Sequence, residues 1–430
     1  MTRRTKGQGG SRSESPHDMP RVLVLADDLS GAADCGIAFI RSGLAAVVML
    51  SDEDAAAARV GADVLALDAD SRRLPPDAAA AVNARLARRY LNDDLVFYKK
   101  IDSTLRGNIA AELAALTPLA GLAIVAPAFP ATGRITRGGR VCVHGMPLET
   151  TGTWQRAQLA GIADIVAILT RGGVRTTRAG LDLVRGKPDA LRDAFDRMGL
   201  EGAEAVVCDA EAEADLAAVA AASARLARRH FWVGSAGLAH HLAQASGIVA
   251  DRRPVSLRLR GPVLVAVGSR SDLSRVQARH LATEPGVSAV TVGPEALLAG
   301  EATPEWRAAS ARLDDALRQG ADVLLTISCS TTARPDEGWR LCAALGRLVA
   351  PFAPRLGGLA ATGGDTARGI LGALGAVGLR LSCEIEPGVA LGVTEGERPL
   401  PVVTKAGAFG GPATLVHCRA VLSGAGAARS

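Results

Sequence analysis

The sequence has few aromatic residues and no long apolar run, and each shortage argues against a class of protein. Aromatic side chains make up 3% of the 430 residues. No stripe of lysine and arginine is interleaved with them, which argues against a surface that stacks nucleic-acid bases. No run approaches the roughly twenty apolar residues that a membrane-spanning helix requires. We therefore expect neither a nucleic-acid nor a membrane partner, and we expect small anionic ligands instead.

The cysteines also lack the spacing of a metal site or a disulfide framework. Seven cysteines are scattered along the chain without a Cys-x-x-Cys pair, a pattern typical of buried thiols in a reducing cytoplasm. Arg3 and Arg4 precede residues 5–20, which contain no apolar signal core. These features predict a soluble cytoplasmic protein with a disordered tail at residues 1–19.

Three familiar active-site motifs are missing. The run closest to a phosphate-binding Gly-x-x-x-x-Gly-Lys-Ser/Thr loop, residues 180–188, has one residue too many and ends in proline. No Gly-x-Gly-x-x-Gly follows a predicted strand, so a dinucleotide-binding domain is unsupported. Residues 234–237 do not have the Gly-x-Ser-x-Gly spacing of a nucleophile elbow.

The composition is that of a folded protein with a large core. Hydrophobic residues account for 48% of the chain and charged residues for 22%, and several of the positive charges behind the net +5 lie in the first twenty residues. The length favours two domains. From Arg21 onward, short Val-, Leu- and Ile-rich runs alternate with alanine-rich segments of helical spacing, a pattern typical of a mainly parallel sheet covered by helices. The alternation breaks at residues 248–261.

We therefore predict an α/β fold of two domains, each a mainly parallel sheet flanked by helices, at residues 20–248 and 262–425 with a linker at 249–261. Helices are expected at 76–91 and 213–230, and an irregular excursion with a hairpin at 130–153. Strands are predicted at 21–26, 45–50, 63–69, 95–101, 122–128, 164–169, 205–209, 231–233, 263–267, 288–292, 323–327, 358–361 and 402–404.

The densest polar stretch, residues 99–108, lies where a predicted strand gives way to a helix. Open α/β folds bind ligands at this carboxyl end of their strands. The simpler alternative is a charged surface turn in which Ser103 or Thr104 caps the helix. The side chains with ligand chemistry are Lys100, Asp102, Ser103, Thr104 and Arg106.

Two further stretches of the first half carry candidate groups. Asp27 and Asp28 end the first strand; because neighbours on an extended segment point to opposite sides, one carboxylate can face a ligand while the other caps the following helix. A plain helix cap would account for only one of the two acids. Arg134 follows another strand and is a candidate anion contact. His144 is more typical of a surface histidine than of a base.

In the second half, three glycine-rich turns each follow a predicted strand, at residues 267–272, 361–369 and 404–412. Glycines let backbone N–H groups approach an anion, and a helix N-terminus adds a favourable dipole, so each turn is a candidate phosphate site. Three such turns in one domain indicate a nucleotide. The candidate residues are Ser269, Thr362, Gly363, Gly364, Asp365, Thr366, Lys405 and Gly407.

Taken together, these stretches resemble the four-carbon acid sugar kinase family, formerly a family of unknown function. The resemblance runs from Arg21 to about Val421 and departs at Ser30, where threonine is usual, and at Ala408, where glycine or asparagine is common. It implies an acid-sugar-binding first domain, a nucleotide-binding second domain with ATP and Mg²⁺, and an active site in the cleft between them. The γ-phosphoryl group would pass to O4 of threonate, erythronate or a 3-oxo-tetronate. The matching motifs are residues 26–32, 99–108, 126–133, 234–238, 362–368, 386–389 and 404–407.

Within that family frame, we assign Asp28 to orient and deprotonate the attacking hydroxyl, with Asp102 and Asp27 as alternates. Arg106 and Lys100 are assigned to the substrate carboxylate, and Arg134 is a further candidate. Asp365 is a rival base.

Two other functions stay open: a kinase for another small hydroxyacid, such as a glycerate-type enzyme, and a non-catalytic sensor of sugar acids or nucleotides. No metal ligands are assigned. The family resemblance leaves a homo-oligomer open.

Overall fold

The computed structural model describes residues 20–52, 61–157, 159–250, 261–269, 271–328, 337–396 and 398–424. The tail predicted at 1–19 and most of the linker predicted at 249–261 lie outside these ranges. We call residues 20–250 the first half of the molecule and residues 261–424 the second half.

Strands of the first half alternate with helices, as predicted. Their bounds are β1 Val22–Ala26, β2 Ala46–Met49, β3 Val64–Asp68, β4 Val96–Lys100, β5 Leu122–Ala126, β9 Thr176–Ala179, β10 Ala205–Cys208 and β11 His230–Gly234. The second half contributes β12 Val263–Val267, β13 Val287–Val292, β14 Asp322–Ile327, β15 Gly358–Thr362, β16 Gly378–Glu386, β17 Val389–Glu395 and β18 Pro401–Lys405.

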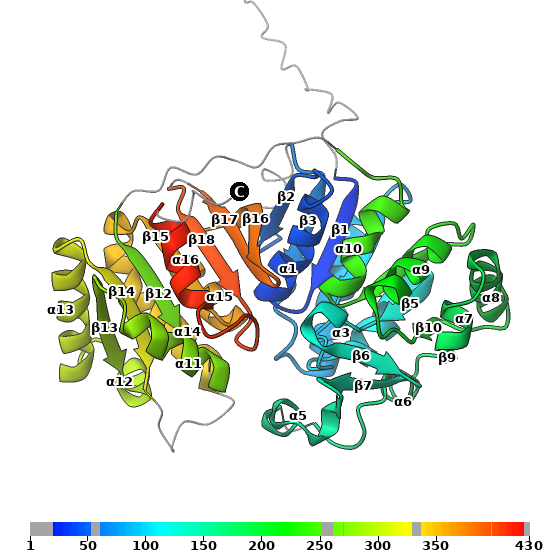
Figure 1. Ribbon diagram of the computed structural model, residues 1–430, viewed down its shortest axis with the longest axis horizontal. Helices are drawn as coiled ribbons and strands as arrows, with labels where there is room; N and C mark the ends of the chain where they lie inside the picture. Colours follow the sequence, from blue (N-terminus) through cyan, green and yellow to red (C-terminus); the bar gives the residue numbers. More distant parts are fainter. Residues whose placement is uncertain are drawn as a thin grey trace, which may run out of the picture.

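These strands form one continuous sheet across both halves (Figure 1), in the order β13-β14-β12-β15-β18-β17-β16-β2-β3-β1-β4-β11-β5-β10-β9. Within this sheet, the strands of the first half pair in parallel with one another, and β13, β14, β12, β15 and β18 are parallel in the second half. The predicted mainly parallel α/β fold is confirmed.

The two halves are joined by an antiparallel hairpin that the sequence analysis missed. β17 pairs with β18, and β16 pairs with β2, so that Leu379 lies opposite Val48. In β16, polar residues such as Arg380 and Glu384 alternate with apolar ones, unlike the continuous apolar runs of the parallel strands, whereas β17 is itself apolar over 389–393. The motif at residues 386–389 is the tight turn of this hairpin, and Gly388 has φ +77 there. The two predicted sheets therefore become one.

Helices cover both faces of the sheet (Figure 1). Side chains of β1 alternate between two cores, because Val22 and Val24 pack under one face and Leu23 and Leu25 under the other. The first core continues from the first half into the second. The helices are α1 Leu29–Ile40, α3 Pro76–Tyr90, α4 Ile109–Ala120, α5 Gly152–Arg156, α6 Ile165–Arg171, α7 Leu181–Val184, α8 Pro188–Leu200, α9 Glu213–Ser223, α10 Ala236–Ala245, α11 Asp272–Ala282, α12 Pro294–Ala299, α13 Pro304–Arg318, α14 Gly338–Val349, α15 Gly364–Ala373 and α16 Thr414–Leu422, with 3₁₀ turns η1 Pro130–Thr132, η2 Leu148–Thr150 and η4 Ala350–Arg355.

Two secondary-structure predictions are wrong. The strand expected at 164–169 is helix α6, capped by the Asp164 carboxylate, which accepts from the backbone N–H of Ala167 at 3.0 Å. Ile165 and Leu169, four residues apart, are both buried, and so short an apolar run fits either structure. The helix expected at 213–230 ends at Ser223, whose hydroxyl donates back to the Val219 carbonyl at 2.6 Å.

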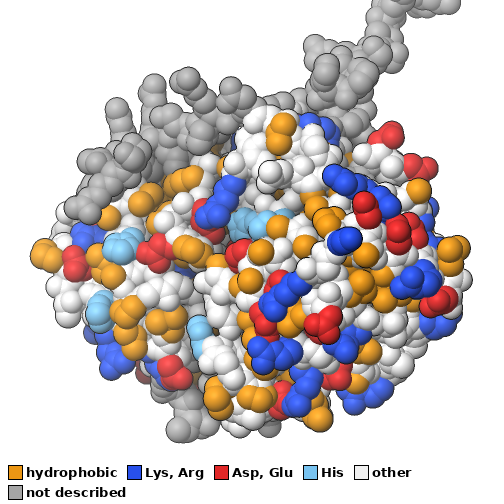
Figure 2. Space-filling view, turned by 45° about the vertical axis from the view of Figure 1, so that its right-hand side comes forward, with side chains coloured by type: hydrophobic (Ala, Val, Ile, Leu, Met, Phe, Trp, Pro, Cys, Tyr) orange, Lys and Arg blue, Asp and Glu red, His pale blue; other side chains and the backbone are white. Residues whose placement is uncertain are grey.

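The excursion predicted at 130–153 contains the expected hairpin, formed by β6 Arg134–Arg137 and β7 Arg140–Val143, and β8 Met146–Pro147 pairs with β7. On the face shown in Figure 2, the described acidic and basic side chains are interspersed over the first half. Among the described residues, no helix combines the length and apolarity that crossing a membrane requires.

Candidate active site

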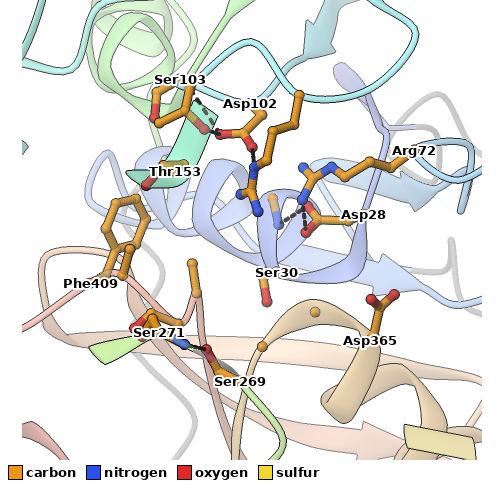
Figure 3. Close-up of a pocket in the computed structure, with 18 of the residues that line it drawn as sticks. Asp28, Ser30, Arg72, Asp102, Ser103, Thr153, Ser269, Ser271, Asp365 and Phe409 are labelled. Atoms are coloured by element: carbon orange, nitrogen blue, oxygen red, sulfur yellow. Dashed lines mark hydrogen bonds and ion pairs between the residues drawn. The ribbon is translucent and has the colours of Figure 1, made fainter. Parts of the chain in front are cut away.

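A cavity of about 550 Å³ lies between the two halves. It opens at the carboxyl ends of β1 and β4 on one side and of β12, β15 and β18 on the other, where the polar turns of the sequence converge (Figure 3). From the first half, the predicted residues that line it are Asp27, Asp28, Lys100, Asp102, Ser103, Thr104, Arg106 and Arg134. From the second half they are Ser269, Gly363, Gly364, Asp365, Thr366 and Gly407.

The two acids after β1 share one arginine that the sequence analysis did not select. Arg72 donates from Nε and Nη2 to both carboxylate oxygens of Asp27, at 2.7 and 2.8 Å, and from Nη1 to Oδ2 of Asp28, at 2.6 Å. Burial raises the pKa of Asp27, but the charges of Arg72, Lys99 and Lys100 outweigh it and hold that pKa below its ordinary value. Asp27 is therefore a buried, ionised anchor for Arg72.

Asp28 faces both the first helix and the second half. Its Oδ1 accepts from the backbone N–H of Gly31 at 2.8 Å, so it is the N-cap of α1. A Cβ added at Gly31 would come 2.6 Å from the same oxygen, and one added at Gly364 would come 2.7 Å from Oδ2. The two glycines therefore let this carboxylate lie at the junction of the halves.

Asp34 lies six residues further along, in α1, and was also missed. Its side chain is buried, lines the cavity, and has an Oδ1 without a hydrogen-bond partner among the described residues. Burial raises the pKa of Asp34 to about 7, although the neighbouring Lys100 ammonium opposes the shift. The Lys100 Nζ donates to the Ile101 carbonyl at 2.9 Å.

The turn after β4 is organised by Asp102. Its Oδ1 accepts from the backbone N–H and the hydroxyl of Thr104, at 3.0 and 3.1 Å, and its Oδ2 forms an ion pair with Arg106. Burial raises the pKa of Asp102, but Arg106, Arg72 and Lys100 together hold it far below its ordinary value. Asp102 is therefore a weak proton acceptor that fixes the turn.

Arg134, at the start of β6, is a buried cation of the cavity. It is 6% exposed, and its Nε has no hydrogen-bond partner within the described part of the chain. Its Nη1 donates to the Thr132 carbonyl at 3.4 Å. Asp102 and Asp34 act on its charge from further away, and no carboxylate of the described residues forms an ion pair with it. Its guanidinium lies over the ring of Phe409, with Cζ 4.6 Å from the centroid. A buried cation of this kind is ready to receive an anion.

The three glycine turns of the second half pack against one another. A Cβ added at Gly407 would come 1.9 Å from the Ser269 hydroxyl, and one at Gly268 would come 2.3 Å from the Thr366 hydroxyl. The Ser271 and Ser274 hydroxyls donate to the Gly407 carbonyl at 2.6 and 2.9 Å. The bare backbone of these turns and the N-terminus of the ten-residue helix α15 therefore face the cavity as an anion cradle.

Thr362 and Lys405, also predicted to contact the nucleotide, lie behind that cradle and do not line the cavity. Both side chains are buried. Burial lowers the pKa of Lys405 to about 8, and its Nζ has no hydrogen-bond partner among the described residues.

Ion pairs also cross between the halves beside the cavity. Arg368 of α15 pairs with Asp68 and, at 3.1 Å, with Asp70. Arg73 lies 3.6 Å from Asp365. Arg72 and Arg73 lie in the turn after β3, just as the predicted site residues lie in turns after other strands. That position is the sequence signal that could have identified them as site residues.

The described residues contain no group of three or more His, Cys, Asp or Glu side chains able to hold a metal ion. Mg²⁺ in nucleotide sites needs only one or two carboxylates, since phosphates and water supply the other ligands. Asp365, which lines the cavity beside the glycine turn, offers such a carboxylate. Burial raises its pKa.

Comparisons with known proteins give a consistent result. A model of a sugar-binding N-terminal domain matches residues 22–242, and a model of a nucleotide-binding C-terminal domain matches residues 264–415. The chain is 48% identical to a D-threonate kinase of Cupriavidus necator, covering 92% of this chain and 96% of that protein. A 3-oxo-tetronate kinase of the same organism is 30% identical, over 91% and 95%. A crystal structure from Salmonella typhimurium LT2 shares the fold, with a TM-score of 0.71 at 21% identity over 92% of this chain and 98% of that one.

Proposed function

The chain belongs to the four-carbon acid sugar kinase family and is a kinase, and from this premise we propose that it transfers the γ-phosphoryl group of ATP to the O4 hydroxyl of D-threonate. The observation that carries the proposal is one cavity with two unlike walls, one of carboxylates beside cations and one of glycine turns. Three relatives between 34% and 48% identical are D-threonate kinases, whereas the D-erythronate and 3-oxo-tetronate kinases are 28% to 30% identical.

The two walls divide the substrates between the halves. We propose residues 20–248 as the acid-sugar-binding domain and 262–425 as the nucleotide-binding domain, which agrees with the descriptions of the matching models. The phosphates would lie against the turns at Ser269, Gly363 and Gly407, where backbone N–H groups and the α15 dipole favour negative charge.

Arg134 is the proposed receptor for the substrate carboxylate. Arg106 is already paired with Asp102 and is 41% exposed, whereas Arg134 is buried and has no ion pair among the described residues. A guanidinium binds a carboxylate through two parallel hydrogen bonds, a geometry that an ammonium does not offer. Lys100 and the hydroxyls of Ser103 and Thr104 would then serve the sugar hydroxyls.

Asp28 is the proposed base. Asp27 has both oxygens bound by Arg72, and the low pKa of Asp102 beside Arg106 makes Asp102 a poor proton acceptor. Asp28 also accepts from Arg72, but through one hydrogen bond rather than two. Asp28 lies beside Gly364 of the nucleotide wall. As the bond between O4 and the γ-phosphorus forms and the bond to the β-phosphate oxygen breaks, the O4 proton would pass to Asp28.

Asp365 would hold Mg²⁺ together with the phosphates. Its carboxylate lines the cavity at the first turn of α15, which fits the donor set that this ion takes in nucleotide sites. The ion would neutralise charge on the transferring phosphoryl group.

A coupled ADP-release assay tests the proposal. We expect turnover on D-threonate to exceed that on D-erythronate, 3-oxo-tetronates and glycerate, and absence of ATP-dependent turnover on every one of these acids would refute it. Arg134→Lys should raise KM for the acid by about 10²-fold, the equivalent of about 3 kcal/mol of bidentate hydrogen bonding, with a smaller effect on kcat.

The matched control for Arg134→Lys is Arg137→Lys. Arg137 lies three residues further along on the exposed side of β6 and pairs with Glu211, so its replacement should leave KM unchanged. An unchanged KM in Arg134→Lys would show that the carboxylate is bound elsewhere, with Arg106 and Lys100 as the next candidates.

A further inference from the structure

One aromatic side chain of the nucleotide wall reaches into the acid-sugar wall. Phe409 lies in the turn between β18 and α16, yet its ring contacts the first half, where it lies under Arg134 and edge-on to Phe129 at 6.3 Å between centroids. Figure 3 shows the ring on the cavity rim, between the Ser269 and Ser271 turn and Ser103. Phe409 therefore bridges the proposed binding regions of the two substrates.

The turn that carries Phe409 is held from the second half. Gln277 of α11 donates from Nε2 to the carbonyls of Phe409 and Gly411, at 3.1 and 2.8 Å. Phe409 and Gly411 lie two and four residues after Gly407, whose carbonyl accepts from Ser271 and Ser274. The ring and the anion cradle therefore belong to one short, hydrogen-bonded turn. A displacement of the cradle therefore displaces the ring.

The ring also packs closely against the backbone at Gly388. A Cβ added at Gly388 would come 2.5 Å from Cδ2 of Phe409, and Gly388 has φ +77, which side-chain-bearing residues rarely adopt. The hairpin turn at residues 386–389 thus accommodates the phenyl ring. This contact gives a role to a motif that the proposed chemistry does not use.

The Phe409 ring gives Arg134 electrostatic support, in addition to the more distant charges of Asp102 and Asp34. Its guanidinium is buried and has no ion pair among the described residues, and the negative face of an aromatic ring stabilises a desolvated cation. Stacking on one face leaves the N–H groups in the guanidinium plane for a bidentate carboxylate.

We propose that Phe409 is a positioning residue that holds Arg134 for the substrate carboxylate and thereby couples nucleotide binding to acid-sugar binding. The inference rests on the proposed function for the identity of the acid. A nucleotide on the cradle orders the turn and its ring, so the acid binds more tightly to the nucleotide-bound protein. Thermodynamic linkage requires the acid to strengthen nucleotide binding by the same factor.

The test is calorimetric titration of D-threonate into the full chain with and without saturating ADP. Wild type should bind D-threonate roughly tenfold more tightly with ADP, within the range that coupling between sites spans. Phe409→Leu keeps apolar bulk without the ring, and should abolish this ratio and raise KM for D-threonate on the order of tenfold, with little change in kcat. Phe409→Tyr retains the ring and should behave as wild type.

A double-mutant cycle separates this role from general packing. In an Arg134→Lys background, Phe409→Leu should change D-threonate affinity far less than in wild type, because the stacked guanidinium is already gone. Equal effects in both backgrounds, or an intact ADP ratio in Phe409→Leu, would overturn the inference. A wild-type protein that shows the ADP ratio but never phosphorylates D-threonate would instead refute the proposed function alone.

Discussion

Replacement of Arg72 should destabilise the first half strongly, because one guanidinium satisfies two carboxylates beside the cavity at once. Arg72→Met keeps the aliphatic stem and removes all three hydrogen bonds to Asp27 and Asp28. Breaking a buried ion pair by deleting one partner destabilises a protein by about 3–5 kcal/mol. Since Lys99 and Lys100 also lower the pKa of Asp27, we expect about 3 kcal/mol at pH 7.5.

The loss should depend on pH in a defined direction. In wild type, the lowered pKa of Asp27 provides stability that is present above pH ~4 and is lost as the pH falls through the folded-state value. Without Arg72, burial dominates and raises that pKa, so Asp27 takes up a proton as the pH falls. The difference between wild type and Arg72→Met should therefore shrink between pH 7.5 and pH 4.5.

Urea unfolding followed by circular dichroism measures both effects. Arg73→Met is the matched control; Arg73 pairs with the partly exposed Asp70 and should cost about 1 kcal/mol or less. Adding Asp27→Asn to Arg72→Met should recover much of the loss, because the uncompensated charge is removed. Additive losses in that double variant, or a pH-independent difference, would refute the role of Arg72 as the shared counter-ion.

Two further predictions concern the acids of the cavity. Burial raises the pKa of Asp34 to about 7, so its contribution to stability is complete below pH ~4 and is lost as the pH rises through about 7. Asp34→Asn should therefore make the free energy of unfolding less dependent on pH between pH 5 and pH 8. An unchanged pH dependence would contradict the burial argument. Asp28→Asn should lower kcat at least 10²-fold with ATP binding retained. Asp365→Asn should chiefly raise the Mg²⁺ concentration required for turnover. Near-normal kcat in Asp28→Asn together with abolished turnover in Asp365→Asn would assign the base to the second half.

Those parts of the site that follow a strand directly could be predicted from the sequence. Strand ends in a parallel sheet meet at one edge, so the turns after β1, β4, β12, β15 and β18 converge once the alternation is recognised. The same periodicity failed at residues 164–169, where an apolar run too short to show its period formed α6. It also missed β16, in which polar residues alternate with apolar ones, and the mainly apolar β17 that pairs with it.

The contacts that turn the two walls into one site lay beyond such patterns, because their partners are far apart in the sequence. Arg368 and Asp68 are separated by 300 positions, and neither residue carries a local signal for the other. Phe409 illustrates the same point: in its glycine-rich turn the sequence suggests a phosphate loop, and nothing nearby indicates that its side chain would stack on Arg134 of the other half. The β2–β16 pairing determines which residues of the two halves meet. It fixes the edge of one parallel sheet against the other and brings their turns face to face across the cavity. A site made between two halves is therefore specified by the register of one strand pair, which a single sequence does not reveal.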